Sequence, residues 1–142
     1  MYDLIKNSIV FAHRDESISD VVRLMNQKHV SSVLIHDDGN KIVGILTERD
    51  IIRKFVLLDL DLKWGKKVAT IMSFPVCLVR MAHLEQDVIR LHFEKNMRHF
   101  PVVSGDGTRM EDVVGMITVT DLCREYLRNR HSQLGIAVEI ED

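Results

Sequence analysis

The stretch Val43-Gly-Ile-Leu-Thr-Glu-Arg-Asp50 returns later in the chain as Val114-Gly-Met-Ile-Thr-Val-Thr-Asp121, at an offset of 71 positions. Closer to the N-terminus, Asp20-Val-Val-Arg-Leu24 matches Asp87-Val-Ile-Arg-Leu91 at an offset of 67. The four-residue difference falls in the turn between two strand-like segments, where surface insertions are tolerated. Self-similarity at a fixed spacing predicts that the chain contains the same folding unit twice.

Each unit is predicted to fold as helix, strand, strand and helix. Ile18, Val21, Val22 and Met25 recur at the spacing of an amphipathic helix, and Ser17 precedes them as a helix cap. Short apolar segments at 8–12 and 75–79 lead into the units. The other expected elements are strands at 32–36 and 41–46, a helix from about 47, a helix at 84–96, strands at 100–103 and 112–117, and a helix at 118–130.

The pattern predicts an α/β (α+β) chain of two domains. We assign residues 1–58 to the first domain, 59–67 to a polar connector, 68–130 to the second domain and 131–142 to a C-terminal tail. Apolar residues alternate in the tail, which leaves open whether it forms an edge strand or stays loose.

Composition excludes several classes of protein. Lys plus Arg number 19 against 21 Asp plus Glu, a net charge of −2, whereas a dedicated nucleic-acid binder usually carries a basic excess. No stretch approaches the roughly 20 apolar residues of a membrane span, and the first residues lack a signal-peptide layout. Two cysteines are too few for a disulfide framework and suit a reducing compartment. We therefore expect a cytoplasmic protein with neither nucleic acid nor membrane as a partner.

The most informative feature is the doubled Thr-x-x-Asp turn, in which Thr47 and Asp50, and Thr118 and Asp121, begin a helix after a strand. Taken alone, each turn is explained by helix capping, because Thr and Asp at these positions satisfy free backbone N–H groups. A second interpretation is a nucleotide site. A helix N-terminus with a hydroxyl can hold phosphate, a carboxylate can accept both hydroxyls of a ribose, and glycine within the preceding strand allows close approach.

The doubled Gly-h-x-Thr-x-x-Asp motif, where h is an apolar residue, resembles that of a tandem pair of cystathionine-β-synthase (CBS) domains, the Bateman module. The stretch Val68-Ala-Thr-Ile-Met-Ser-Phe-Pro-Val76 resembles the segment that enters such a domain, and Phe100-Pro-Val-Val103 resembles its central strand. The resemblance covers about residues 4–57 and 69–130. It implies two units that pack through their sheets about a pseudo-twofold axis, and a homodimer in the assembled protein.

The resemblance also implies roles for single residues, because members of this family typically bind adenosine compounds between the two repeats. Asp50 and Asp121 would hold ribose hydroxyls, and Thr47 and Thr118 would hold phosphate. Thr120 supplies the second hydroxyl that the family often places before the Asp.

The remaining expected ligand contacts are basic or apolar. In the first repeat the residue before the Asp is Arg49, which lacks the hydroxyl that the family often has there and would contact phosphate as a cation. Arg98 and His99 precede the central strand of the second repeat, whereas the first repeat has serines at 31–32, so the second repeat is expected to be better equipped for phosphate. An ordinary solvated charge at a helix end would equally explain Arg98. The adenine would lie against Val76, Pro101 and Met116.

No catalytic or metal-binding motif accompanies these turns. The seven histidines are scattered without His-x-x-x-His spacing, and the sequence has no Cys-x-x-Cys, no Gly-x-Ser-x-Gly and no P-loop. We therefore expect no metal, no required cofactor and no enzymatic activity. The leading hypothesis is a regulatory module that binds AMP, ADP, ATP, S-adenosylmethionine or a similar ligand and signals to an unidentified protein target. The alternative is a ligand-free dimeric adaptor for a separate enzyme, channel or transporter, and an enzyme of unrecognised type is a weaker third.

Overall fold

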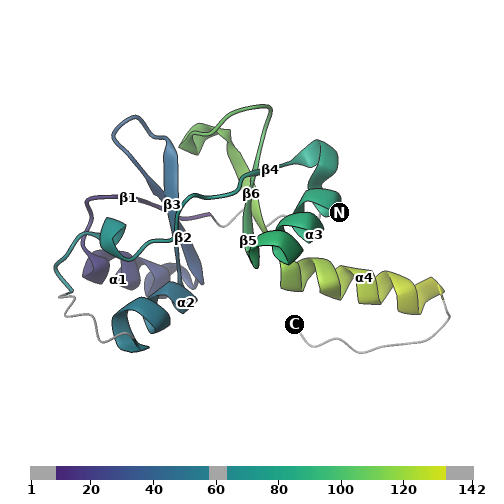
Figure 1. Ribbon diagram of the computed structural model, residues 1–142, viewed down its shortest axis with the longest axis horizontal. Coiled ribbons are helices and arrows are strands. Elements are labelled where there is room, and N and C mark those ends of the chain that lie inside the picture. Colours follow the sequence, from purple (N-terminus) through teal and green to yellow (C-terminus); the bar gives the residue numbers. More distant parts are fainter. Residues whose placement is uncertain (1–8, 58–63, 134–142) are drawn as a thin grey trace.

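Two similar units lie side by side in the structure, a computed structural model that describes residues 9–57 and 64–133 (Figure 1). The first unit contains β1 (Phe11–His13), α1 (Ile18–Lys28), β2 (Ser32–His36), β3 (Ile42–Thr47) and α2 (Glu48–Asp50), which continues as a π-helix (Ile51–Leu57). The second contains β4 (Val79–Arg80), α3 (Leu84–Lys95), β5 (His99–Val103), β6 (Val113–Thr118) and α4 (Val119–Gln133). The predicted order of helix, strand, strand and helix is confirmed in both. The last helix is longer than predicted, because α4 continues past residue 130 through the first three residues of the expected tail at 131–142. The rest of that tail and the expected domain end at 58 lie outside the described residues.

Each sheet has three strands, one more than the sequence predicts. The order is β1-β2-β3 in one sheet and β4-β5-β6 in the other, with the first pair parallel and the second antiparallel. The additional strands, β1 and β4, come from the short apolar lead-in segments. They are three and two residues long, too short to show an alternating pattern.

The repeat extends to fine details of the backbone. The ladder of the first sheet shifts register between Ile35 and His36, and that of the second sheet between Val102 and Val103, which are the equivalent positions at the offset of 67. His29 follows α1 and Asn96 follows α3, and both cap residues have the left-handed conformation that closes many helices. These matches indicate that the two units share one backbone plan.

The units pack together through their sheets. A cluster of buried side chains from both units, Leu34, Ile42, Ile45 and Met116, lies between the sheets. Two backbone hydrogen bonds join the hairpin turns, from Ile42 N–H to the Thr108 carbonyl (2.9 Å) and from Met110 N–H to the Asn40 carbonyl (2.8 Å). The pairing of equivalent hairpins fits the expected pseudo-twofold arrangement.

Each unit also has its own core between its sheet and its helices. The second core is formed by residues of α3, α4 and the second sheet. The first core includes Val68 and Ile71, which are fully buried beside α1 and β2 although they follow the connector. The segment that begins the second repeat in sequence therefore also completes the core of the first.

Gly44 is the point at which this segment comes closest to β3. Ser73 and Ile45 exchange two backbone hydrogen bonds, of 2.8 and 3.0 Å. A Cβ at position 44 would lie 2.9 Å from Met72 Cγ and closer still to the Met72 sulfur. The close approach expected at this glycine is thus made by a methionine side chain.

We predict that Gly44→Ala lowers the free energy of unfolding by about 1 kcal/mol, the lower end of the cost of overpacking, because the Met72 side chain is flexible. Urea unfolding of Gly44→Ala in the wild-type and Met72→Ala backgrounds measures the coupling. The loss should shrink when Met72 is truncated. An equal loss in both backgrounds would show that Met72 is not the constraint.

Candidate functional site

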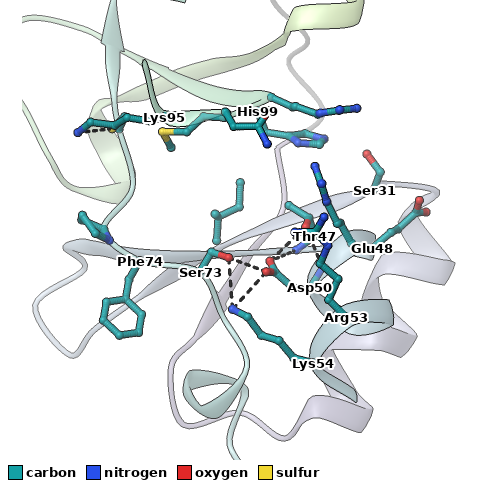
Figure 2. Close-up of a pocket in the computed structure, with 17 residues that line it drawn as sticks. Ser31, Thr47, Glu48, Asp50, Arg53, Lys54, Ser73, Phe74, Lys95 and His99 are labelled. Carbon is teal, nitrogen blue, oxygen red and sulfur yellow. Dashed lines mark hydrogen bonds and ion pairs between the residues drawn. The ribbon is translucent and has the colours of Figure 1, made fainter. Parts of the chain in front are cut away.

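A cavity of about 740 Å³ lies between the two repeats. Its walls come from the Thr47–Asp50 turn and the π-helix after it, from residues 73–75 and Cys77, and from residues 95–99. In Figure 2, Thr47, Asp50 and Lys54 lie on one side of the cavity, and Lys95 and His99 lie on the opposite side. A molecule bound here would touch both repeats.

Asp50 is a buried carboxylate with both oxygens engaged by the protein. Its Oδ2 accepts hydrogen bonds from the backbone N–H of Thr47 (3.0 Å) and from the Thr47 hydroxyl (3.1 Å), while Asp50 N–H donates to that hydroxyl (3.2 Å). Its Oδ1 accepts from the Ser73 hydroxyl at 2.5 Å. The predicted capping box is confirmed, and Ser73 adds a contact from the segment that enters the second repeat.

Lys54 completes this arrangement from one helical turn further on. Its Nζ lies 3.3 Å from Asp50 Oδ1. The same ammonium donates to the carbonyls of Ile71 (3.0 Å) and Met72 (3.3 Å) and to the Ser73 hydroxyl (3.4 Å). Because the side chain is only one-third exposed, this contact is better shielded than a surface ion pair. Lys54 therefore ties the first Thr-Asp turn to residues 71–73.

The occupied oxygens change the expected chemistry of the turn. A carboxylate has about four acceptor positions, and Thr47, Ser73 and Lys54 already use them at Asp50. A ribose hydroxyl can bind Asp50 only by sharing or replacing the contact of Ser73 or Lys54. The turn is consequently both a structural cap and a potential ligand contact.

The second turn repeats the hydroxyl–carboxylate contacts of the first in a different setting. The Thr118 hydroxyl donates to Asp121 Oδ2 at 2.7 Å, and Asp121 N–H donates back to it at 3.1 Å. Arg124 lies 3.8 Å from the buried Asp121. The position equivalent to Lys54 is Glu125, so the two turns differ in local charge.

The cavity gathers five of the predicted ligand residues and leaves six elsewhere. Those that line it are Thr47, Arg49, Asp50, Arg98 and His99. Val76 and Met116 pack between the sheets, Pro101 lies opposite Met116 in the β5–β6 ladder, and Thr120 is exposed beside the second turn. The remaining two are Thr118 and Asp121, which form the second turn.

Arg98 and His99 lie in a cavity other than the one that the sequence suggests. The sequence predicts that they equip the turn of their own repeat, whereas the structure shows them lining the cavity of the Thr47–Asp50 turn. The backbone of this segment is held at the second turn, because the Arg98 carbonyl accepts a hydrogen bond from Val119 N–H at 3.0 Å. The packing of the repeats then presents these residues to the first.

Sequence reasoning missed several residues that line the cavity. Arg53 and Lys54 follow Asp50 at three and four positions, a helical spacing that could have identified them. Ser73 and Lys95 carry no such signal, because they reach the site through long-range packing. Among residues 9–57 and 64–133, no cluster of three or more His, Cys, Asp or Glu residues could hold a metal ion. Within the same residues, no helix is long and apolar enough to cross a membrane.

The fold and the cavity together define a pair of α+β repeats with a ligand-sized space between them. The CBS domain family matches residues 1–57 and 68–128. This chain therefore belongs to the CBS domain family and contains two copies of the domain in tandem.

Relatives of known sequence or structure agree with this assignment. The meiotically up-regulated gene 70 protein of Schizosaccharomyces pombe is 32% identical over 121 residues, a match that covers 81% of this chain and 16% of that protein. The chain thus spans less than a fifth of the length of the first two curated relatives it matches. The CBS domain pair of MJ0100, solved with 5-methylthioadenosine and S-adenosyl-L-methionine, is 25% identical, with a TM-score of 0.72 and coverage of 89% and 94% of the two chains. CBSX2, solved with AMP, is 25% identical, with a TM-score of 0.67 and coverage of 90% and 96%.

His99 has a perturbed pKa because of its position between the two turns. Burial lowers the pKa of its imidazole below the ordinary histidine value, and the Arg98 charge acts in the same direction. The carboxylates of Asp121, Glu48 and Asp50 oppose that shift without cancelling it. At neutral pH the imidazole is therefore uncharged.

We predict that His99 makes the folded protein lose stability as the pH falls below about 6.5, the ordinary histidine pKa. In that range the unfolded chain binds a proton before folded His99 does, so acid favours unfolding. The free energy of unfolding, measured in urea from about pH 7.5 to 5.5, should fall more steeply for the wild type than for His99→Gln. Parallel curves would mean that the His99 pKa does not change on folding.

Proposed function

We propose that this chain is a non-catalytic regulatory module that binds an adenosine nucleotide between its two CBS repeats and signals to a partner protein. The observation that carries the proposal is the cavity in which Thr47 and Asp50 of one repeat face Arg98 and His99 of the other. Hydroxyl, carboxylate and basic groups around one space are what a ribose phosphate requires.

The polar contacts can be proposed residue by residue. Asp50 would bind ribose hydroxyls after exchanging the contact of Ser73 or Lys54. Thr47, Arg49 and Arg98 would hold phosphate. The residue roles are those that the family resemblance implies. The difference is that Arg98, of the second repeat, now serves the same cavity as Thr47, Arg49 and Asp50 of the first.

The adenine contacts need revision, because Val76, Pro101 and Met116 do not line this cavity. Ile45, Pro75 and Met97 do line it and offer apolar surface for the base. We propose these three as the adenine wall. The solved structures of MJ0100 and CBSX2, which contain adenosine compounds, support the class of ligand.

A second site at Thr118, Thr120 and Asp121 remains a proposal by analogy. Residues 73–75, which line the first cavity, correspond to residues 6–8 at the offset of 67, and these lie outside the described residues. We place the principal site at Asp50 because its cavity brings the Thr-Asp turn of one repeat together with Arg98 and His99 of the other.

Signalling requires that the ligand bind two states of the module with different affinities. A ligand that contacts both repeats favours the state in which both walls of the cavity can reach it. Binding would thereby change the relative position of the two repeats. We propose that a separate protein target reads that change, and that the module works in the cytoplasm.

We further propose a homodimer, formed through the outer faces of α3 and α4. Phe93 is 83% exposed and Tyr126 is 59% exposed, and Ile89 and Leu127 are also exposed on these helices. Figure 1 shows α3 and α4 together at one end of the second unit. A group of exposed apolar side chains of this kind is typical of an interaction surface.

For the ligand site, we predict that Asp50→Asn weakens binding of an adenosine nucleotide by about 1–3 kcal/mol, the cost of an unsatisfied polar group. Isothermal titration calorimetry with AMP and ATP measures it. Asp121→Asn is the matched control and should have a smaller effect. A larger effect at Asp121 would move the principal site to the second turn.

The same titrations separate the regulatory module from the adaptor. Failure of the wild-type protein to bind AMP, ADP, ATP, S-adenosylmethionine or 5-methylthioadenosine would leave both turns as helix caps. The ligand-free dimeric adaptor would then be the better account.

For the dimer, we predict a mass of two chains in multi-angle light scattering and a shift toward one chain in Phe93→Glu, because a charge would be buried in the interface. Val114→Glu, which changes an exposed apolar residue of β6, should leave the mass unchanged. A Phe93→Glu protein that stays dimeric would exclude this face.

A further inference from the structure

We propose that the cavity selects its ligand by charge, favouring adenosine nucleotides with several phosphates and disfavouring the cationic S-adenosylmethionine. This inference rests on the proposed adenosine site and specifies its ligand. The sequence alone does not distinguish these compounds, because they share adenine and ribose.

The first observation is an excess of unpaired positive charge. Arg49, Arg53, Lys95 and Arg98 line the cavity, and none of them forms an ion pair with a carboxylate of the described residues. Glu48 is the one lining carboxylate without an ion pair among those residues. Four cations therefore face one acid, in a chain whose net charge is −2.

The second observation is that the other carboxylate of the cavity is already neutralised. Asp50 lies 3.3 Å from the Lys54 ammonium and accepts three further hydrogen bonds from Thr47 and Ser73. It can accept a ribose hydroxyl by exchange, but it has no spare negative charge for a cationic group. A sulfonium or an ammonium would instead meet the basic side chains.

The third observation is that the cations come from both repeats. Arg49 and Arg53 belong to the α2 turn and its π-helix, whereas Lys95 ends α3 and Arg98 precedes β5. Their mutual repulsion opposes a close approach of the two walls. An anion bound between the two walls would attract both. A cleft lined by charges of one sign also raises the local concentration of oppositely charged ligands.

Size does not oppose the proposal. The cavity volume of about 740 Å³ lies within the range of roughly 300–1,000 Å³ that is common for small-molecule sites. His99, uncharged at neutral pH, adds a hydrogen-bonding group to the wall without reducing the positive charge.

The test is a series of calorimetric titrations at pH 7.5 without divalent cations, which would mask phosphate charge. ATP, ADP, AMP and adenosine differ in phosphate number. S-adenosylmethionine differs from the neutral 5-methylthioadenosine by its sulfonium charge and by an arm that carries an ammonium and a carboxylate, for a net charge of +1. We expect each added phosphate to lower the dissociation constant roughly fivefold, the effect of one charge pair at 4 Å in water. S-adenosylmethionine should bind more weakly than 5-methylthioadenosine, and the ATP advantage should shrink at high salt.

Variants assign the effect to this cavity. Arg53→Gln and Arg98→Gln should weaken ATP binding about fivefold or more and leave adenosine binding nearly unchanged. Arg23→Gln removes the same charge from the exposed surface of α1 and is the matched control. Circular dichroism and thermal unfolding establish that each variant is folded.

The outcomes separate this inference from the proposed function. Equal affinity along the phosphate series, or tighter binding of S-adenosylmethionine than of 5-methylthioadenosine, would overturn the charge selection and leave the adenosine site standing. The phosphate dependence of affinity would not belong to this cavity if Arg53→Gln and Arg98→Gln changed it no more than the control Arg23→Gln does. Binding of none of the six compounds would contradict the proposed function itself.

Discussion

The buried carboxylate of Asp50 is the constraint on which the rest of the site depends. A charge removed from water must be paired and hydrogen-bonded, or it destabilises the fold. Here Thr47, Ser73 and Lys54 provide the partners, and two of them join segments that are distant in sequence. Satisfying this one group therefore fixes the start of α2 and also holds residues 71–73 against the first repeat.

That attachment determines where the second repeat lies. Ser73 is hydrogen-bonded to Ile45 of β3, and Val68 and Ile71 are buried in the first core. The chain therefore enters the second repeat from a fixed position. The sheets then meet through a shared apolar cluster, and the end of α3 comes to face the first Thr-Asp turn. The basic side chains on the two sides of the cavity follow from this placement, and they give an anionic ligand a way to act on both repeats.

Much of the fold could be predicted from the sequence, because the doubled motif and the helix and strand patterns are local. The capping of α2 by Thr47 and Asp50 also follows from spacing alone. The edge strands β1 and β4 could not be predicted, since two or three residues show no period. The site was predicted in part: Arg98 and His99 were identified as ligand residues but grouped with the turn of their own repeat. Ser73 and Lys95 reach the cavity only through tertiary packing, which no local pattern records.

The central claim is that one ligand contacts both repeats in the cavity at Asp50. NMR titration of the labelled protein with ATP tests it most directly, by following the Thr47 amide of the first repeat and the His99 ring of the second. We expect both signals to shift along a single binding curve with the same dissociation constant. Movement of the Thr118 and Asp121 amides with no change at Thr47, or different dissociation constants for Thr47 and His99, would contradict a shared site.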